Sequence, residues 1–262
     1  MIEIKHISQA YGNHPVLKDV SLNIKEQRIT ALIGANGAGK TTLLNVAANL
    51  VPASEGEVLL DGISIKEMKS IEIAKKIAIL KQTQHLSMRV TVKELISFGR
   101  YPHSKGRLKS EDEEKIWEAI QYMNLEEIQD RFIDELSGGQ RQRAYIAMIL
   151  SQDTKYIFLD EPLNNLDVKY SVEMMGILQK LVQELHKTVI IVLHDINFAA
   201  AFADEIVAMK DGRIIKEGEA GDIVDHDTMA EVFDHDFHII NVGTRKVCVY
   251  FQPESIKIPE SD

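Results

Sequence analysis

Eight residues near the N-terminus, Gly34-Ala-Asn-Gly-Ala-Gly-Lys-Thr41, match the pattern G-x-x-x-x-G-K-[ST] and narrow the possible folds sharply. They follow the apolar run Ile29–Ile33, which indicates a buried strand, and they precede Thr41–Leu50, whose composition favours a helix. Glycines here let backbone N–H groups surround a phosphate, and the helix N-terminus adds partial positive charge. Lys40 is then expected to reach the β- and γ-phosphates, and the Thr41 hydroxyl to bind Mg²⁺. A chance glycine-rich turn would lack the flanking strand and helix.

The pattern of apolar residues predicts an α/β fold. Apolar and polar residues are interleaved over 17–24, as in a half-buried strand, whereas Tyr156–Leu159 and Val189–Leu193 are apolar throughout, as in buried parallel strands. The Asp-Gly pairs at 61–62 and 211–212 predict hairpins, because a type I′ turn needs positive φ at both central positions. From about 68 to 152 the pattern is helical. This segment is therefore predicted to be an insertion into an α/β domain.

Composition excludes several classes of protein. Of the 262 residues, 45% are hydrophobic and 27% charged, which does not fit a disordered, collagen-like or disulfide-stapled chain. The longest apolar runs are short, whereas a membrane-spanning helix needs about 18 residues. No secretory signal is visible, and the single Cys248 cannot form an internal disulfide, so a reducing, cytoplasmic setting is expected. The net charge of −10 disfavours nucleic acid as the main partner.

Two carboxylates, Asp160 and Glu161, close the predicted strand Tyr156–Leu159. In a phosphate-loop fold, this strand end is where a second contact to Mg²⁺ would lie, which makes Asp160 the candidate. Glu161 is the candidate base that polarises an attacking water. The alternative is a pair of solvated loop carboxylates, which the upstream phosphate loop disfavours.

A third segment, Leu136-Ser-Gly-Gly-Gln-Arg141, also points to phosphate. Ser137 and Gln140 have the spacing of a capping box, so an ordinary helix start is the simple interpretation. Two glycines in a first helical turn, however, cost roughly 1 kcal/mol each against alanine. They let a phosphate approach backbone N–H groups closely. The segment therefore predicts a second phosphate-binding helix N-terminus.

Together these three segments resemble the ATP-binding subunit of an ATP-binding-cassette (ABC) transporter, and Leu136–Gln140 matches the signature motif of that family. The resemblance covers nearly the whole chain. It implies a P-loop NTPase fold with a RecA-like core, an antiparallel β subdomain and an inserted helical subdomain. The core with its β subdomain and a short tail would comprise residues 1–83 and 153–262, and the helical subdomain residues 84–152.

The resemblance also assigns roles to single residues. Tyr11 would stack on adenine, with Val16 beside it. Gln82 would contact Mg²⁺ and water and link the core to the insert. Asp167 would lie at a dimer interface, and His194 would contact the γ-phosphate, although a histidine after a buried strand is usually a packed or capping residue. The residues expected to contact nucleotide are Tyr11, Val16, Gly34, Ala35, Asn36, Gly37, Ala38, Gly39, Lys40, Thr41, Thr42, Gln82, Ser137, Gly138, Gly139, Gln140, Asp160 and Asp167. Those expected to act in catalysis are Glu161, His194, Gln82 and Lys40, and those expected to bind Mg²⁺ are Thr41, Gln82 and Asp160.

In this family two copies face head to tail, and each ATP lies between the phosphate loop of one copy and the signature segment of the other. ATP then holds the pair together, and hydrolysis loosens it. The resemblance therefore implies a homodimer or a pair with a close relative, docked on a separate transmembrane permease at the cytoplasmic face of the membrane. An extracellular binding protein would deliver the substrate.

Three further segments resemble the ATPases of iron–siderophore importers, especially the catecholate branch: Val92–Pro102, Glu161–Asp167 and His194–Phe198. The segment Val92–Pro102 lies where the family usually contacts its permease. Two departures are visible. Lys81 replaces a common proline, and Asn164-Asn165 replaces a commoner sequence with threonine. Neither departure is expected to touch a catalytic position.

Other functions are disfavoured by particular features. Haem, vitamin B12 and export remain alternatives within transport. DNA-repair relatives carry long coiled coils, ribosome-acting relatives carry two cassettes, and a P-loop kinase would lack Leu136–Arg141. Residues from about 215 are expected to form a short acidic tail. Its histidines, at 226, 235 and 238, do not have a recognised metal-ligand spacing.

Overall fold

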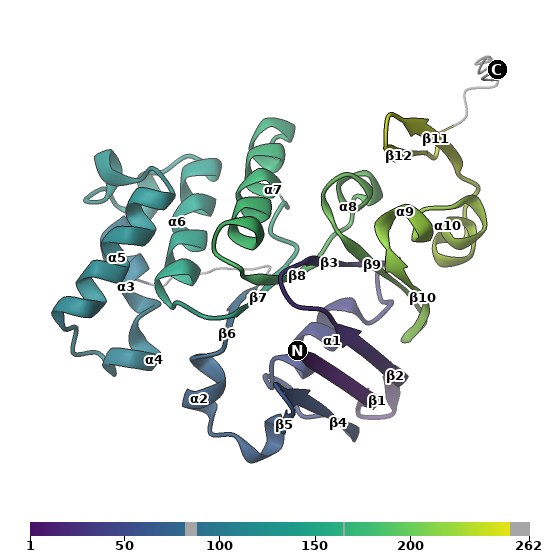
Figure 1. The fold of residues 1–262 in the computed structure, drawn as a ribbon, viewed down its shortest axis with the longest axis horizontal. Helices are drawn as coiled ribbons and strands as arrows, with labels where there is room; N and C mark the ends of the chain where they lie inside the picture. The colour runs from purple at the N-terminus through teal and green to yellow at the C-terminus, as the bar shows by residue number, and fades with distance from the viewer. Residues whose placement is uncertain (82–87, 165, 252–262) are drawn as a thin grey trace.

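The computed structural model describes residues 1–81, 88–164 and 166–251 (Figure 1). The strands are β1 (Ile2–Tyr11), β2 (His14–Ile24), β3 (Ile29–Ile33), β4 (Glu55–Leu60), β5 (Ile63–Ser64), β6 (Ile77–Leu80), β7 (Tyr156–Asp160), β8 (Thr188–Val192), β9 (Glu205–Lys210), β10 (Arg213–Glu219), β11 (His238–Val242) and β12 (Arg245–Val249). The α-helices are α1 (Lys40–Ala47), α2 (Ser70–Ala74), α3 (Val92–Phe98), α4 (Tyr101–Ser104), α5 (Ser110–Tyr122), α6 (Gly138–Ser151), α7 (Val168–Gln183), α8 (Ile196–Phe202), α9 (Ala220–Ile223) and α10 (His226–Phe233).

The central sheet has the strand order β10-β9-β3-β8-β7-β6. Strands β9, β3, β8, β7 and β6 are parallel, and β10 pairs antiparallel with β9. A second sheet, β2-β1-β4-β5, is antiparallel throughout. The loop at 34–39 follows β3 and Asp160 ends β7, with β8 between these two strands. Because the strands are parallel, their carboxyl ends bring the loop and Asp160 to one edge of the sheet.

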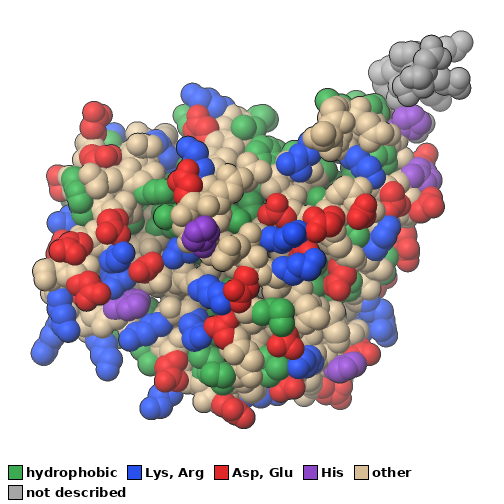
Figure 2. Space-filling view, in the orientation of Figure 1, with side chains coloured by type: hydrophobic (Ala, Val, Ile, Leu, Met, Phe, Trp, Pro, Cys, Tyr) green, Lys and Arg blue, Asp and Glu red, His purple; other side chains and the backbone are tan. Residues whose placement is uncertain are grey.

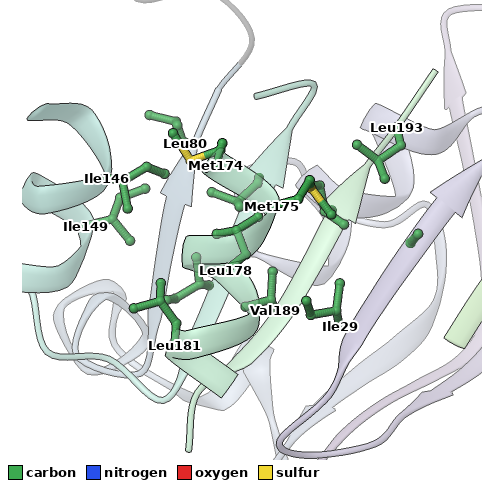
Figure 3. Packing of buried hydrophobic residues seen from close by; sticks show 14 of the residues in the cluster. Ile29, Leu80, Ile146, Ile149, Met174, Met175, Leu178, Leu181, Val189 and Leu193 are labelled. Atoms are coloured by element: carbon green, nitrogen blue, oxygen red, sulfur yellow. The ribbon is translucent and has the colours of Figure 1, made fainter. Parts of the chain in front are cut away.

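The central strands are buried on both faces, which explains why they are apolar throughout. In β7, Ile157 and Leu159 belong to one hydrophobic cluster, while Tyr156 and Phe158 belong to the other. The first cluster includes helix α7, whose Met175 and Leu178 point toward the strands in Figure 3. The second contains α1 and the antiparallel sheet. Hydrophobic packing on both faces of the sheet thus fixes the strand ends at which the predicted site residues lie.

The helices α3, α5 and α6 group together beside α7 (Figure 1). Their apolar side chains continue into the first hydrophobic cluster without a break, as Ile146 and Ile149 of α6 beside Leu80 of β6 show (Figure 3). At the far end of α6, the buried Arg100 donates to Asp112 over 2.9 Å and to the carbonyl oxygen of Ser151 over 2.7 Å. This buried pair ties α3 and α4 to α5 and α6.

Most of the predicted elements are present, with two exceptions. The Asp-Gly hairpins have positive φ at both positions, 53° and 81° at 61–62 and 49° and 80° at 211–212. The interleaved strand and both buried strands also form as predicted. The helical stretch predicted from about 68, however, contains the strand β6. A run of only four apolar residues is too short for its pattern to distinguish a strand from a helix.

The prediction of a short tail after about 215 is wrong. Residues 213–249 form β10, α9, α10 and the hairpin β11–β12, and the hairpin packs on α8. Buried residues such as Val224, Met229 and Cys248 join the first hydrophobic cluster. Many surface aspartates obscure this apolar pattern in the sequence. In the part of the chain that the structure describes, no group of histidine, cysteine and acidic residues could hold a metal ion.

The surface mixes both signs of charge. Figure 2 shows Lys and Arg side chains interspersed with Asp and Glu over the whole visible face. Over residues 1–81, 88–164 and 166–251, no helix is long and apolar enough to span a bilayer.

Candidate nucleotide site

The loop Gly34–Gly39 connects the buried strand β3 to α1, and its glycines are required for different reasons. Gly34 has φ of 145°, and a Cβ atom there would lie 2.2 Å from the carbonyl oxygen of Met209 in β9. Gly39 has φ of 99°, and its Cβ would lie 2.8 Å from a Leu17 methyl group and 3.0 Å from the Val16 carbonyl oxygen. Gly37 has φ of 83°, and no atom of the described ranges lies within 4 Å of a Cβ placed there. The loop therefore packs tightly at both ends and is open at its middle.

These contacts make a stability prediction. We expect Gly34→Ala to lower the free energy of unfolding by about 2–4 kcal/mol, because the new methyl group collides with backbone of β9. The matched control is Gly37→Ala, which has open space around its Cβ and should cost only about 1 kcal/mol for its positive φ. Thermal unfolding followed by circular dichroism measures both. Equal losses in the two variants would contradict the packing described for Gly34.

Lys40 begins α1 and points back over the loop. Its ammonium group donates to the carbonyl oxygens of Gly34 and Ala35 over 2.8 and 3.0 Å. The side chain is buried, and this burial lowers the pKa of Lys40, while the nearby carboxylates of Glu161 and Asp160 oppose the shift. A cation is thus held at the loop and at the N-terminus of a helix, which is a favourable arrangement for binding phosphate.

Thr41 and Asp160 meet across the sheet edge. The Thr41 hydroxyl donates to Asp160 Oδ1 over 2.8 Å. Asp160 is buried at the end of β7, and burial raises the pKa of its carboxyl group, which the hydrogen bond from Thr41 opposes. One hydroxyl and one carboxylate in contact at a phosphate loop form the hard oxygen donor set that suits Mg²⁺. Thr42, Ala38 and the exposed Asn36 complete the loop and the first turn of the helix.

Glu161 contacts His194 across the strands β7 and β8. Its carboxylate pairs with His194 Nε2, and its other oxygen accepts a hydrogen bond from Asn164 Nδ2 over 2.5 Å. Glu161 has φ of 53°, which turns the chain sharply after β7. The Glu161 side chain is 9% exposed and that of His194 is 39% exposed. Both line a cavity of about 230 Å³ together with Asn164 and Phe198.

Asn164 corrects one expectation from the sequence, because it does touch a candidate catalytic residue. The backbone N–H of Asn164 also donates to the Glu161 carbonyl oxygen over 3.3 Å, so a turn brings the two side chains together. Pro162, at the second position of Glu161–Asn164, is a turn signal that could have suggested this contact.

The segment Ser137–Gln140 forms the capping box that its spacing predicts. Ser137 Oγ accepts from the Gln140 N–H over 3.3 Å, and Gln140 accepts from the Ser137 N–H over 3.1 Å. Among the residues that the structure describes, no atom lies within 4 Å of a Cβ placed on Gly138, whereas a Cβ on Gly139 would lie 2.6 Å from the Tyr170 ring in α7. Gly138 is therefore open to a ligand, while Gly139 allows α6 to pack on α7.

The signature segment and the phosphate loop of one chain are not joined. No hydrogen bond in the described ranges connects residues 137–140 with residues 34–41. Instead, Gln142 of α6 donates to the Pro162 carbonyl oxygen over 2.9 Å, next to Glu161. Figure 1 shows α6 among the helices of the insert, apart from α1. Within one chain, these two predicted phosphate-binding segments therefore belong to different parts of the fold.

The remaining predicted residues lie around this arrangement. Tyr11 ends β1 with 49% of its surface exposed, and the neighbouring β2 carries Val16 against Gly39. Asp167 is exposed and precedes α7 without a hydrogen bond from its side chain to the helix. Gln82 lies outside the described residues. The half-exposed ring of Tyr11 leaves a face on which a base could stack.

A parallel sheet with a glycine-rich loop, a buried lysine and paired carboxylates at its carboxyl edge defines a P-loop nucleotide-binding protein. The sequence model of the ABC transporter family matches residues 17–164, which is more than half of the chain. The chain therefore belongs to the ABC transporter family and is an ATPase of this type. The predicted P-loop fold and family are confirmed.

Related proteins extend the match over nearly the whole chain. The petrobactin import ATP-binding protein YclP of Bacillus subtilis (strain 168) is 49% identical over 96% of this chain and 100% of the relative. The ferric enterobactin transport ATP-binding protein FepC of Escherichia coli (strain K12) is 36% identical over 87% of this chain and 85% of its own length. Among solved structures, cbiO1 from Clostridium perfringens has a TM-score of 0.78 at 28% identity, covering 88% of this chain and 92% of that one.

One solved relative was determined as a dimer. The bacterial ABC transporter cassette MJ0796 has a TM-score of 0.74 at 33% identity, and the match covers 84% of this chain and 99% of the cassette.

Proposed function

We propose that this chain is the ATP-hydrolysing subunit of an importer for an iron–siderophore complex. The 49% identity to a petrobactin import protein over 96% of the chain carries this proposal. The match to a ferric enterobactin transport protein also supports it. The catecholate class of siderophore is the substrate class favoured by the segments Val92–Pro102, Glu161–Asp167 and His194–Phe198.

At the proposed site, residues of this chain hold ATP for attack by water. Tyr11 and Val16 bind the base, and the loop 34–39 with Lys40 binds the β- and γ-phosphates. Thr41 and Asp160, with Gln82, would hold Mg²⁺, and this ion would supply positive charge near the phosphate oxygens. The contact between the Thr41 hydroxyl and Asp160 supports this assignment.

Glu161 and His194 act where the γ-phosphate meets water. The water oxygen bonds to the γ-phosphorus and Glu161 accepts a proton from this water, while the bond between the γ-phosphorus and the bridging oxygen breaks and leaves ADP and phosphate. His194 donates a hydrogen bond to the γ-phosphate. The contact between Glu161 and His194 supports their acting together. Asn164 donates a hydrogen bond to the second carboxylate oxygen of Glu161 and so orients this carboxylate.

Two copies arranged head to tail would complete each site. The signature residues Ser137–Gln140 of one copy contact the γ-phosphate bound by the other, and Asp167 lies at their interface. The separation of these segments within one chain supports this arrangement, as does the dimeric cassette found among the solved relatives. Gly138 is the glycine that the neighbouring phosphate approaches.

The dimer would dock on transmembrane permease subunits at the cytoplasmic face of the membrane, with an extracellular binding protein supplying the substrate. In the segment Val92–Pro102, Phe98 and Tyr101 are 42% and 63% exposed, so they are available for this contact. Arg100 of the same segment is buried against Asp112. The chain would then be divided into a helical unit, residues 84–152, that meets the permease and a nucleotide-binding unit, residues 1–83 with 153–262.

Uptake of radiolabelled iron tests the transport proposal. Iron-starved cells that lack this chain would be complemented with the native chain or with Glu161→Gln and offered one catecholate and one hydroxamate siderophore. The native chain should restore uptake of the catecholate complex, and the variant should not. Equal uptake of both complexes by cells without the chain, with the native chain and with Glu161→Gln would contradict the siderophore proposal. ATP hydrolysis would then be tested separately with the purified chain.

A further inference from the structure

The C-terminal hairpin is joined to α8 through one side chain. Asn197 Nδ2 donates to the Cys248 carbonyl oxygen over 3.2 Å, and the Cys248 N–H donates to Asn197 Oδ1 over 2.7 Å. Cys248 is buried in β12, and it shares a hydrophobic cluster with Ala199 of α8. The amide of Asn197 therefore pairs with both backbone groups of one residue, as a neighbouring strand would.

Each of the two elements is too small to be stable alone. A two-stranded hairpin such as β11–β12 is marginal in water, and so is an isolated helix as short as α8. Burial raises the pKa of Cys248 to about 11, so this thiol is uncharged at neutral pH and packs as a small apolar group. The hairpin thus depends on its contact with α8 for a fixed position, and this contact adds to the packing of α8 on β3 and α7.

Helix α8 begins directly after His194. Asp195 caps the helix, and its carboxylate accepts from the Asn197 N–H over 2.8 Å and the Phe198 N–H over 3.4 Å. On the other side of His194, the Leu193 N–H donates to the Leu32 carbonyl oxygen over 3.1 Å. The backbone of His194 is therefore set by the sheet on one side and by α8 on the other.

We infer that Asn197 is a positioning residue, which holds His194 against Glu161 by fixing α8 to the C-terminal hairpin. This inference rests on the proposed function, in which His194 and Glu161 act on the γ-phosphate. Asn197 bonds to Cys248 through its side chain and to Asp195 through its backbone, so it acts on His194 through these two elements. A small displacement of α8 would move the imidazole away from the carboxylate, and catalysis is sensitive to such displacements.

The test is steady-state hydrolysis of MgATP by the full chain carrying Asn197→Ala. We expect kcat to fall about tenfold while KM stays within about twofold, because the loss is in the transition state and ATP binds mainly through the phosphate loop. The matched control is Asn241→Ala, an exposed residue of β11 in the same hairpin. It should retain the wild-type kcat. Wild-type kcat in Asn197→Ala would overturn the inference.

A double variant separates positioning from general damage to the fold. In a His194→Ala background, Asn197→Ala should lower kcat by less than about twofold further, since the group it positions is already absent. Independent, multiplying losses would overturn the inference. Asn197→Asp keeps the oxygen that accepts from the Cys248 N–H, so its kcat should lie between those of the wild-type chain and Asn197→Ala. If Asn197→Ala does not fold, a wild-type kcat in Asn197→Asp would overturn the inference. An inactive wild-type chain would instead contradict the proposed function.

Discussion

Replacing Glu161 with glutamine is expected to lower ATP turnover at least about 100-fold while leaving ATP binding intact. Glutamine has nearly the same shape and can still accept the hydrogen bond from Asn164, but it cannot take a proton from water. The phosphate loop, Lys40 and the Thr41–Asp160 pair are unchanged. Phosphate release measures turnover, and equilibrium binding of a fluorescent ATP analogue measures affinity.

A matched control makes this result specific. Glu114 is an exposed carboxylate of α5, so Glu114→Gln removes one negative charge far from the sheet edge and should hydrolyse ATP at the wild-type rate. Wild-type turnover in Glu161→Gln would assign the proton-accepting role to another group.

Replacing Lys40 with alanine is expected to weaken ATP binding at least about 100-fold, which corresponds to about 2.7 kcal/mol. The change removes the Lys40 ammonium group, which the carbonyl oxygens of the loop hold in place. Charge-assisted hydrogen bonds from such a group to phosphate are among the strongest in a site of this kind. The fold should remain, because the lost group is a buried cation whose pKa is already lowered by desolvation. Isothermal titration of ATP measures the change.

The exposed Lys75 provides the control for charge, and Lys75→Ala should bind ATP with wild-type affinity. Equal affinity in Lys40→Ala and the wild-type chain would exclude Lys40 from the phosphate site.

Local patterns in the sequence were enough to predict much of the fold. The apolar runs of β3, β7 and β8 and the two Asp-Gly turns were predictable, because burial on both faces and positive φ impose strict residue types. Strand β6 was not predictable, since a run of four apolar residues fits a helix as well as a strand. The C-terminal elements were missed because their buried residues are spread thinly among aspartates, so that only tertiary packing reveals the apolar face.

The candidate site was predictable where one residue type has a strict geometric requirement. Gly34, Lys40 and Asp160 stand at a loop and a strand end that the pattern itself defines. The positions of Asn164 and Asn197 depend on a turn and on a hairpin about 50 residues away. Contacts of that kind follow from the folded backbone, so periodicity and spacing do not reveal them.

The composite site between two copies is tested most directly by the mass of Glu161→Gln in solution. Analytical ultracentrifugation would compare the variant with and without MgATP, and with an added Ser137→Ala substitution. The chain should sediment near 29.6 kDa without nucleotide and near twice that mass with MgATP, and Ser137→Ala should restore the smaller mass. A chain that stays at 29.6 kDa with ATP bound, or a dimer that is indifferent to Ser137, would contradict head-to-tail sharing of ATP.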